Sequence, residues 1–300
     1  MTKSNVQFFR GLLFLALAQI MVGVNIVCSK LIVSTIPILF ILTIRFTLAT
    51  VLLLLLHAMK DARRFSISVY FSPLNRRDWF FMIAQGLSAG ILFNFLMMLG
   101  LHYTDANVAG IITSALPAMI ALMSWLMLKE KISGKKWGCV ILATLGLVVI
   151  AGDKLQGVTL AHSFMGDAIV LLSLIPEATY YVLCKMHRHS LPVFLISAFM
   201  NGMNAILLLL LLMFVSWGGF HIQGFDWLIL IILGVSSGFF YVFWYFGCQY
   251  VDGVMASLST AIMPVSTVII AWLMLGERLN GGEALGMGMV LLSIAMYAKR

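Results

Sequence analysis

The sequence predicts an all-α integral membrane protein whose ten transmembrane helices form two inverted five-helix repeats. Three observations lead to this prediction. The chain is 62% hydrophobic and 10% charged, whereas a soluble domain carries about 25% charged residues. Apolar runs long enough to cross about 30 Å of hydrocarbon recur along the chain, and lipid-exposed backbone must satisfy its hydrogen bonds within helices. Finally, the two halves of the sequence match each other at nearly constant offsets.

Short connections join the ten predicted spans. The spans are 11–33, 37–57, 79–103, 105–128, 134–152, 166–186, 192–217, 227–250, 253–275 and 281–298. A polar segment at 59–78 separates the second span from the third, and a linker at 153–163 separates the halves. We therefore assign residues 1–152 to the first five-helix repeat and residues 164–300 to the second. The first apolar run lacks the small-residue cleavage site of a signal peptide, so we interpret it as a span.

The duplication is clearest in the fourth and ninth spans, which share a proline, a Trp-Leu-Met-Leu sequence and a charged end. Pro117 and Pro264 lie 147 residues apart. The same offset relates Asp105 to Asp252, Trp125 to Trp272, Glu130 to Glu277 and Gly134 to Gly281. Lys30 and Lys185 lie 155 residues apart, so the first helices of the two halves also match. Because five is an odd number, the second half enters the membrane from the opposite side, which makes the repeat inverted.

The basic residues predict the orientation. Of the 19 Lys and Arg residues, fifteen fall in segments on the same side as the N-terminus. Lys30, Lys154 and Arg278 fall on the other side, and Arg45 lies within a span. Because cytoplasmic loops are enriched in Lys and Arg, we predict that both termini are cytoplasmic, in a bacterial inner membrane. The net charge of +8 therefore indicates orientation rather than binding to nucleic acid.

Glu177 is the strongest candidate for a functional residue, because it lies in the middle of the sixth span. A carboxylate at this depth costs several kcal/mol unless it is paired, protonated or hydrated. Ser173, Tyr180, Tyr181 and Cys184 share its helical face, which predicts a polar stripe that faces the bundle interior. The stripe fits a substrate or proton site or, alternatively, a structural partner for a buried cation.

Arg45 is the natural candidate for a partner of Glu177 and for a second substrate contact. Its place about eight residues into the second span also allows its long side chain to reach the membrane boundary. Four amides within spans fit either interhelical hydrogen bonds or ligand contacts. They are Asn25, Asn94, Asn201 and Asn204. Tyr241, in an aromatic stretch of the eighth span, fits substrate stacking or core packing.

The paired prolines predict a feature of the fourth and ninth spans. A proline inside a helix removes one backbone hydrogen bond and clashes with the carbonyl four residues earlier. These carbonyls belong to Thr113 and Thr260, whose hydroxyls can compensate. Pro117 and Pro264 therefore predict either two tolerated kinks or two hinges that gate a site near the membrane midplane.

Other features fit structural roles. Glu130 and Glu277 each precede a basic residue, so we expect local pairing at these helix ends, and Lys30 and Lys185 are interpreted as boundary charges. Two GxxxG pairs, matched at an offset of 148, permit close helix contacts within the chain or across a homodimer. They are Gly86 with Gly90 and Gly234 with Gly238.

No known catalytic or nucleotide-binding motif occurs in the sequence. It contains no Walker loop, Rossmann glycine pattern, HExxH motif or nucleophile elbow. Its four cysteines have no metal-ligand spacing and predict no disulfide framework. We therefore predict no enzyme, no cofactor, no metal site and no ATP-driven pump.

The repeat motif resembles that of the EamA branch of the drug/metabolite transporter superfamily. The resemblance rests on the two helix endings at 117–132 and 264–279, on Gly23-Val24-Asn25 with Lys30, and on Arg45-Phe46. It implies a ten-helix carrier of small metabolites, including amino acid exporters, with cytoplasmic termini and peripheral fifth and tenth helices. The implied cavity is lined by the first, third, fourth, sixth, eighth and ninth helices. Its residues would be Asn25, Asn94, Pro117, Glu177, Tyr241 and Pro264.

One departure from the family bears on the substrate. The family often has a tryptophan before the glycine of the first helix and at the matching place in the sixth, where this chain has Val22 and Glu177. We therefore predict a secondary transporter that moves an amino acid or another amine-bearing metabolite by alternating access, with Glu177 available for proton coupling. The alternatives are a carrier of nucleosides, nucleotide-like compounds or cationic drugs, or a non-transporting membrane scaffold. The expected partners are the small-molecule substrate and membrane lipid.

Overall fold

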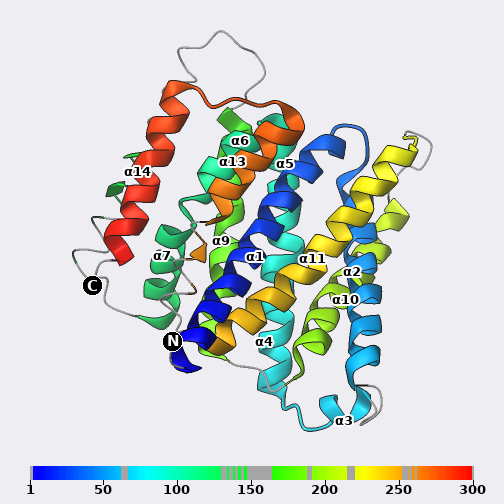
Figure 1. Ribbon diagram of the computed structural model, residues 1–300. Coiled ribbons are helices and arrows are strands. Elements are labelled where there is room, and N and C mark those ends of the chain that lie inside the picture. Colours follow the sequence, from blue (N-terminus) through cyan, green and yellow to red (C-terminus); the bar gives the residue numbers. More distant parts are fainter. Residues whose placement is uncertain are drawn as a thin grey trace.

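The computed structural model is a bundle of helices (Figure 1). It describes residues 3–61, 67–129, 164–187, 191–214, 220–251 and 262–298, with isolated positions within 134–146 and 256–260. The predicted fifth span and the linker at 153–163 therefore lie largely outside the described residues.

The described elements are helical throughout. They are α1 (Lys3–Ile32), α2 (Ile38–Asp61), α3 (Ile67–Phe71), α4 (Arg76–Gly86), the π-helical turn η1 (Leu87–Leu92), α5 (Phe93–Tyr103), α6 (Ala106–Thr113), α7 (Leu116–Leu128), α9 (Phe164–Met186), α10 (Val193–Leu211), the 3₁₀ turn η2 (Leu212–Phe214), α11 (Gly224–Tyr250), α13 (Ile262–Leu275) and α14 (Gly281–Ala298). Six helices are long and apolar enough to cross a membrane, or seven if the bent pair α6–α7 counts as one span. The prediction of an all-helical membrane protein is therefore confirmed.

The first helices of the two halves run in opposite directions. Thr104, which follows α5, contacts both Lys30 near the end of α1 and Asp167 near the start of α9. We call this end of the bundle the Lys30 end. At the other end, the N-terminal end, Arg10 in α1 lies 5.8 Å from the ring of Tyr250, the last residue of α11. Figure 1 shows the antiparallel course of α1 and α11 along each other.

The packing of the helices is also duplicated. α1 packs along α11, and α9, its counterpart in the second half, packs along α5, the counterpart of part of α11. The second helices of the two halves, α2 and α10, pack against each other. Each first helix therefore lies against the third helix of the other half. α14 lies at the periphery of the bundle (Figure 1).

Glycines supply the close approaches between helices. A Cβ atom on Gly90 would lie 1.8 Å from the Asn204 amide nitrogen of α10. A Cβ atom on Gly234 would lie 2.6 Å from Leu48 of α2. Both contacts are within the chain, so these GxxxG pairs serve internal packing rather than a dimer face.

The fourth span bends close to Pro117, as the sequence predicts. α6 and α7 meet at 43°. Pro117 is the second residue of α7, and Pro264 is the third residue of α13. Pro117 thus lies beside the break between α6 and α7, in the first turn of α7, where the missing N–H is tolerated. The start of the ninth span before Pro264 lies partly outside the described residues. Thr113 donates to Gly110 O at 2.5 Å, and Thr260 is buried two residues before the start of α13.

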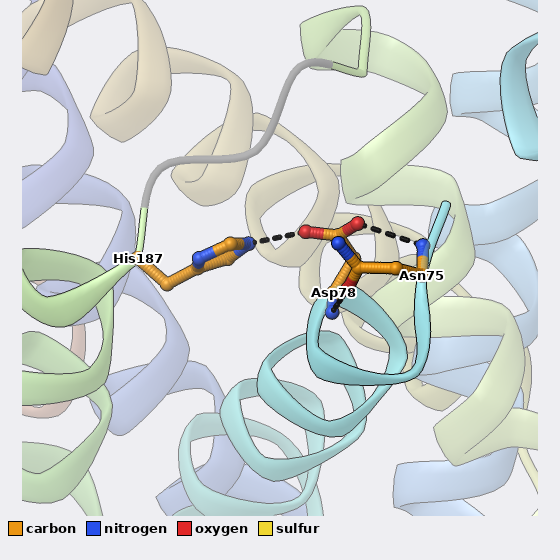
Figure 2. A network of polar contacts seen from close by, with 3 residues as sticks. All are labelled: Asn75, Asp78 and His187. Carbon is orange, nitrogen blue, oxygen red and sulfur yellow. Dashed lines mark hydrogen bonds and ion pairs between the residues drawn. The ribbon is translucent and has the colours of Figure 1, made fainter. Parts of the chain in front are cut away.

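At the N-terminal end, a polar contact joins the two halves (Figure 2). His187, just after α9, lies with its Nε2 2.7 Å from Asp78 Oδ1. The other Asp78 oxygen accepts from the Asn75 N–H at 2.9 Å, and the Asn75 side chain accepts from the Asp78 N–H. This is a capping box, a reciprocal arrangement that satisfies the free N–H groups at the start of α4. The start of α4 is thereby fixed to the end of α9.

Candidate functional site

A small polar cavity lies inside the bundle, between elements of both halves. Its volume is about 30 Å³, enough for about two water molecules. Its polar lining residues are Asn25, Ser29, Arg45, Asn94, Glu177, Ser237 and Tyr241, supplied by α1, α2, α5, α9 and α11. The cavity brings together most of the residues that the sequence singled out.

Glu177 lies on the predicted polar stripe, and the structure confirms that this stripe faces inward. The side chain of Glu177 is 1% exposed, and Ser173, Tyr180 and Tyr181 are also buried. One helical turn further on, the Tyr181 hydroxyl lies beside the Glu177 carboxylate. The Tyr181 oxygen in turn accepts from Gln19 Nε2 of α1 at 3.4 Å. Glu177 is thus held in place by a contact that leads back to the first half.

Arg45 enters the same cavity from α2. It is 6% exposed, so the alternative in which its side chain reaches the membrane boundary is wrong. Its Nε atom has no hydrogen-bond partner among the described residues. Arg45 and Glu177 interact electrostatically across the cavity, yet no ion pair within 4.0 Å joins them in the described chain. A buried cation and a buried anion that do not neutralise each other in direct contact are costly, so the site favours a ligand that contacts both.

Two of the four amides that the sequence singled out, Asn25 and Asn94, line the polar cavity, and their environments differ. Asn94 donates to the carbonyls of Ala89 and Gly90 at 2.8 and 2.7 Å. These carbonyls belong to η1, so Asn94 stabilises the π-helical turn beside the cavity. Asn25 donates to Met21 O at 2.9 Å, and its Oδ1 atom is buried without a partner in the described chain. Asn25 therefore offers an acceptor to a ligand, whereas the donors of Asn94 are occupied.

An aromatic layer separates the polar cavity from a second cavity. Tyr241 lines the polar cavity, and its ring lies 6.0 Å from that of Tyr180. Tyr180 stacks edge-on against Tyr181, and Tyr181 lies 4.7 Å from Trp244. Tyr180 itself lines neither cavity, and its hydroxyl is buried without a partner among the described residues. The structure therefore places Tyr180 in the layer rather than at the site, while Tyr241 is at the site.

The second cavity lies at the N-terminal end, and we call it the end cavity. Its volume is about 350 Å³, which is within the usual range for small-molecule sites. Tyr181 and Trp244 form its inner wall, and its remaining polar residues are Ser124, Cys184, Lys185, His187, Tyr245, Cys248 and Gln249. Tyr181 thus faces Glu177 with its hydroxyl and also lines the larger cavity.

The expected cavity composition needs two corrections. Pro117 and Pro264 line neither cavity. The fourth and ninth helices, which the resemblance places at the site, line only the end cavity in the described chain, through Ile120, Ser124 and Ala256. The second helix, which the resemblance does not include, supplies Arg45. Neither proline therefore contacts either cavity directly.

The Lys30 end is closed by contacts that sequence analysis missed. Lys30 Nζ donates to Leu101 O at 2.9 Å and to Thr104 O at 2.7 Å. The Thr104 hydroxyl donates to Asp167 Oδ1 of α9 at 2.6 Å. Lys30 is therefore more than a boundary charge, because it binds the carbonyls at the end of α5 beside a contact between the halves.

Glu277 also joins the two halves at this end. Its carboxylate accepts from the backbone N–H groups of Asn107 and Ala106, at 2.7 and 3.3 Å. These groups begin α6, where the helix dipole favours an anion. The expectation that Glu277 pairs locally is wrong, since the N–H groups that donate to it lie about 170 residues away in the chain. Partial burial raises the pKa of Glu277 above its ordinary value of 4.5, and the neighbouring Asp105 raises the pKa further.

Comparison with known proteins places the chain in a family of transporters. The sequence profile of the EamA-like transporter family matches residues 9–152 and 164–298. The uncharacterized transporter YetK of Bacillus subtilis (strain 168) is 28% identical over 92% of this chain and 83% of its own length. An uncharacterized transporter of Synechocystis sp. (strain PCC 6803) is 26% identical over 100% of this chain and 92% of its own length.

A solved structure shows the same fold. One crystal structure superposes on 99% of this chain and 97% of its own chain with a TM-score of 0.66, at 17% sequence identity. At this identity the likeness concerns the fold alone.

Proposed function

The chain belongs to the EamA-like transporter family, and from this premise we propose that it carries an amino acid or another amine-bearing metabolite across the membrane by alternating access. It is a membrane transporter and not an enzyme. One observation carries the finer proposal, namely that Glu177 and Arg45 are buried together in one polar cavity. We also propose ten spans in two inverted repeats with cytoplasmic termini, a proposal that the opposite directions of α1 and α9 support.

The charges of the cavity favour a substrate with both an ammonium and a carboxylate group. A buried carboxylate such as Glu177 binds an ammonium group strongly, because little water competes for it. The Arg45 guanidinium matches a carboxylate in two-point geometry. Phosphate-bearing substrates are disfavoured, since among the described residues Arg45 is the one cation that lines the polar cavity. A scaffold would gain nothing from two buried charges that do not pair directly.

The route to the site runs through the end cavity. The polar cavity, at about 30 Å³, is too small for an amino acid in this conformation, whereas the end cavity at about 350 Å³ accepts one. The substrate would enter from the N-terminal end and displace the rings of Tyr181 and Trp244 to reach Glu177. When the substrate is absent, Glu177 binds a proton, which couples substrate movement to the proton gradient.

Uptake into proteoliposomes tests this proposal. The wild-type protein is expected to take up labelled amino acids, with competition by unlabelled amines. Glu177→Gln keeps the size of the side chain and removes its charge, and should reduce uptake at least about tenfold, because breaking a buried charge contact costs more than 1.4 kcal/mol. Its uptake should also lose its dependence on an imposed pH gradient. Asp226→Asn, which removes a carboxylate at the start of α11 outside both cavities, is the matched control.

Arg45 separates amino acids from simple amines. Arg45→Gln should weaken the competition by amino acids at least about tenfold and leave the competition by amines without a carboxylate nearly unchanged. Uptake that is unchanged in Glu177→Gln would remove this residue from the mechanism. Equal weakening of both ligand classes by Arg45→Gln would show that Arg45 has a structural role only.

A further inference from the structure

The two ends of the bundle contain equivalent residues in different arrangements. Lys30 and Lys185 lie 155 residues apart and are counterparts in the repeat. Lys30 binds the carbonyls of Leu101 and Thr104. The counterparts of these two residues, at the offset of 147, are Cys248 and Val251. The sequence therefore contains the parts of the Lys30 contact twice, once at each end.

At the N-terminal end, the three counterpart residues line a cavity. Lys185, Cys248 and Val251 all contribute to the wall of the end cavity, whose volume is about 350 Å³. The equivalent residues at the Lys30 end are in direct contact, with donor–acceptor distances of 2.9 and 2.7 Å. The contact of Lys30 thus closes one end, whereas the matching residues at the other end line a cavity.

The contact that Glu277 makes at the Lys30 end also involves residues that have counterparts in the repeat. It caps the start of α6 through Asn107 and Ala106. In the sequence, the offset of 147 relates Glu277 to Glu130, and Ala106 and Asn107 to residues 253 and 254. These three counterparts lie outside the described residues.

We propose that Lys30 and Lys185 are alternating latches, and that the closed N-terminal end is held by Lys185 donating to the carbonyls of Cys248 and Val251 while the Lys30 contacts are broken. The inference rests on the alternating access proposed above. An ammonium group near the carbonyl end of a helix is stabilised both by the helix dipole and by charge-assisted hydrogen bonds. Since each latch closes one end, the two contacts compete, and their balance sets which end is open.

Crosslinking between thiols reports the closed N-terminal end directly. In a background with Cys28→Ser, Cys139→Ser and Cys184→Ser, the Lys185→Cys variant can be linked to the native Cys248 by a short bifunctional thiol reagent. This variant lacks the Lys185 ammonium group, so its yield reports the effect of the Lys30 latch alone. The position-30 latch is then broken by Lys30→Met. The crosslinking yield should rise by about tenfold or more, the effect expected for loss of hydrogen bonds from a charged donor.

Two controls make the result specific. Lys129→Met removes a charge from an exposed residue at the N-terminal end and should leave the yield unchanged. Lys30→Arg keeps a cationic donor and should restore most of the wild-type yield. Size-exclusion profiles identify any variant that fails to fold, and Lys30→Gln then replaces Lys30→Met as the test.

The outcomes separate this inference from the proposed function. A yield that is the same in Lys30→Met and Lys129→Met, in protein that still transports amines, would overturn the latches and leave the function intact. A yield that rises as expected, in protein that neither binds nor transports any amine, would support the latches and overturn the substrate class.

Discussion

Counterpart residues in the two halves of this transporter differ in two ways, and each kind of difference has a separate meaning. Val22 and Glu177 are counterparts with different side chains, and only Glu177 brings a charge to the cavity that both line. Lys30 and Lys185 are counterparts with the same side chain, yet one closes an end of the bundle and the other lines a cavity. Differences in sequence are permanent and concern the substrate. In the proposed cycle, differences in the contacts of identical residues belong to one conformation and exchange between the two ends.

The largest effect on stability is expected at a pair of matched glycines. Gly90 and Gly238 are counterparts, but a Cβ atom on Gly90 would lie 1.8 Å from Asn204, whereas one on Gly238 would lie 3.4 Å from Leu53. Asn204 also donates to Gly86 O at 3.0 Å, a contact that its displacement would break. Gly90→Ala should therefore destabilise the protein by about 1–3 kcal/mol. Gly238→Ala should have little effect, because 3.4 Å is an ordinary contact distance.

Thermal unfolding in detergent measures both glycine variants under the same conditions. A melting temperature lowered by several degrees in Gly90→Ala alone would confirm that the halves pack differently at this point. An equal fall in the melting temperature of the two variants would show that α10 packs no more tightly against η1 than α2 packs against α11.

A smaller effect, on the balance between the two closed ends, is expected when the Lys30 end is made more like the N-terminal end. Thr104 has Val251 as its counterpart, so Thr104→Val removes the hydroxyl that donates to Asp167 and gives both ends the same side chain. The backbone carbonyl that binds Lys30 remains. Loss of one hydrogen bond to a charged acceptor should shift the balance toward the open Lys30 end by about 1.5 kcal/mol, or about tenfold.

The crosslinking between Lys185→Cys and Cys248 measures this shift, and Thr50→Val is a matched control because Thr50 donates within its own helix, to Phe46 O. A yield that does not change in Thr104→Val would mean that the contact with Asp167 contributes nothing to the balance between the ends.

Local patterns in the sequence predicted much of the fold and part of the site. Hydropathy and helical periodicity placed Glu177 on a buried stripe, because both depend only on neighbouring residues. Arg45 needed the structure, since its burial is decided by the rotation of α2 against α10 and α11. The role of Glu277 could not be predicted, because the adjacent Arg278 offered a local partner and the groups that it caps are far away in the chain. The capping boxes at Asn75 and Gln223 could have been predicted, since an aspartate follows each by three residues.

The smallest expected effect is a dependence of the latch balance on pH, and it comes from Glu277. In the closed Lys30 end, burial and the nearby Asp105 raise the pKa of Glu277, against the opposing effects of Lys30 and the N–H groups of α6. When this end opens, the carboxyl becomes exposed and its pKa falls toward the ordinary value. The state in which the pKa is higher binds the proton more tightly, so acidification favours the closed Lys30 end, and this preference is lost as the pH rises through the raised pKa.

The yield of the crosslink between Lys185→Cys and Cys248 should therefore fall as the pH is lowered. Because the reactivity of thiols also depends on pH, the yield is compared at each pH with that of the same variant carrying Glu277→Gln, which cannot titrate at this position. The effect should be small, since Glu277 is only partly buried and solvent screens its charge. A ratio that stays constant would show that Glu277 has the same pKa in both states, and a ratio that rises on acidification would show that the open Lys30 end is the state that binds the proton more tightly. Glu177 is present in both variants, so its own protonation cancels from the ratio and leaves the contribution of Glu277.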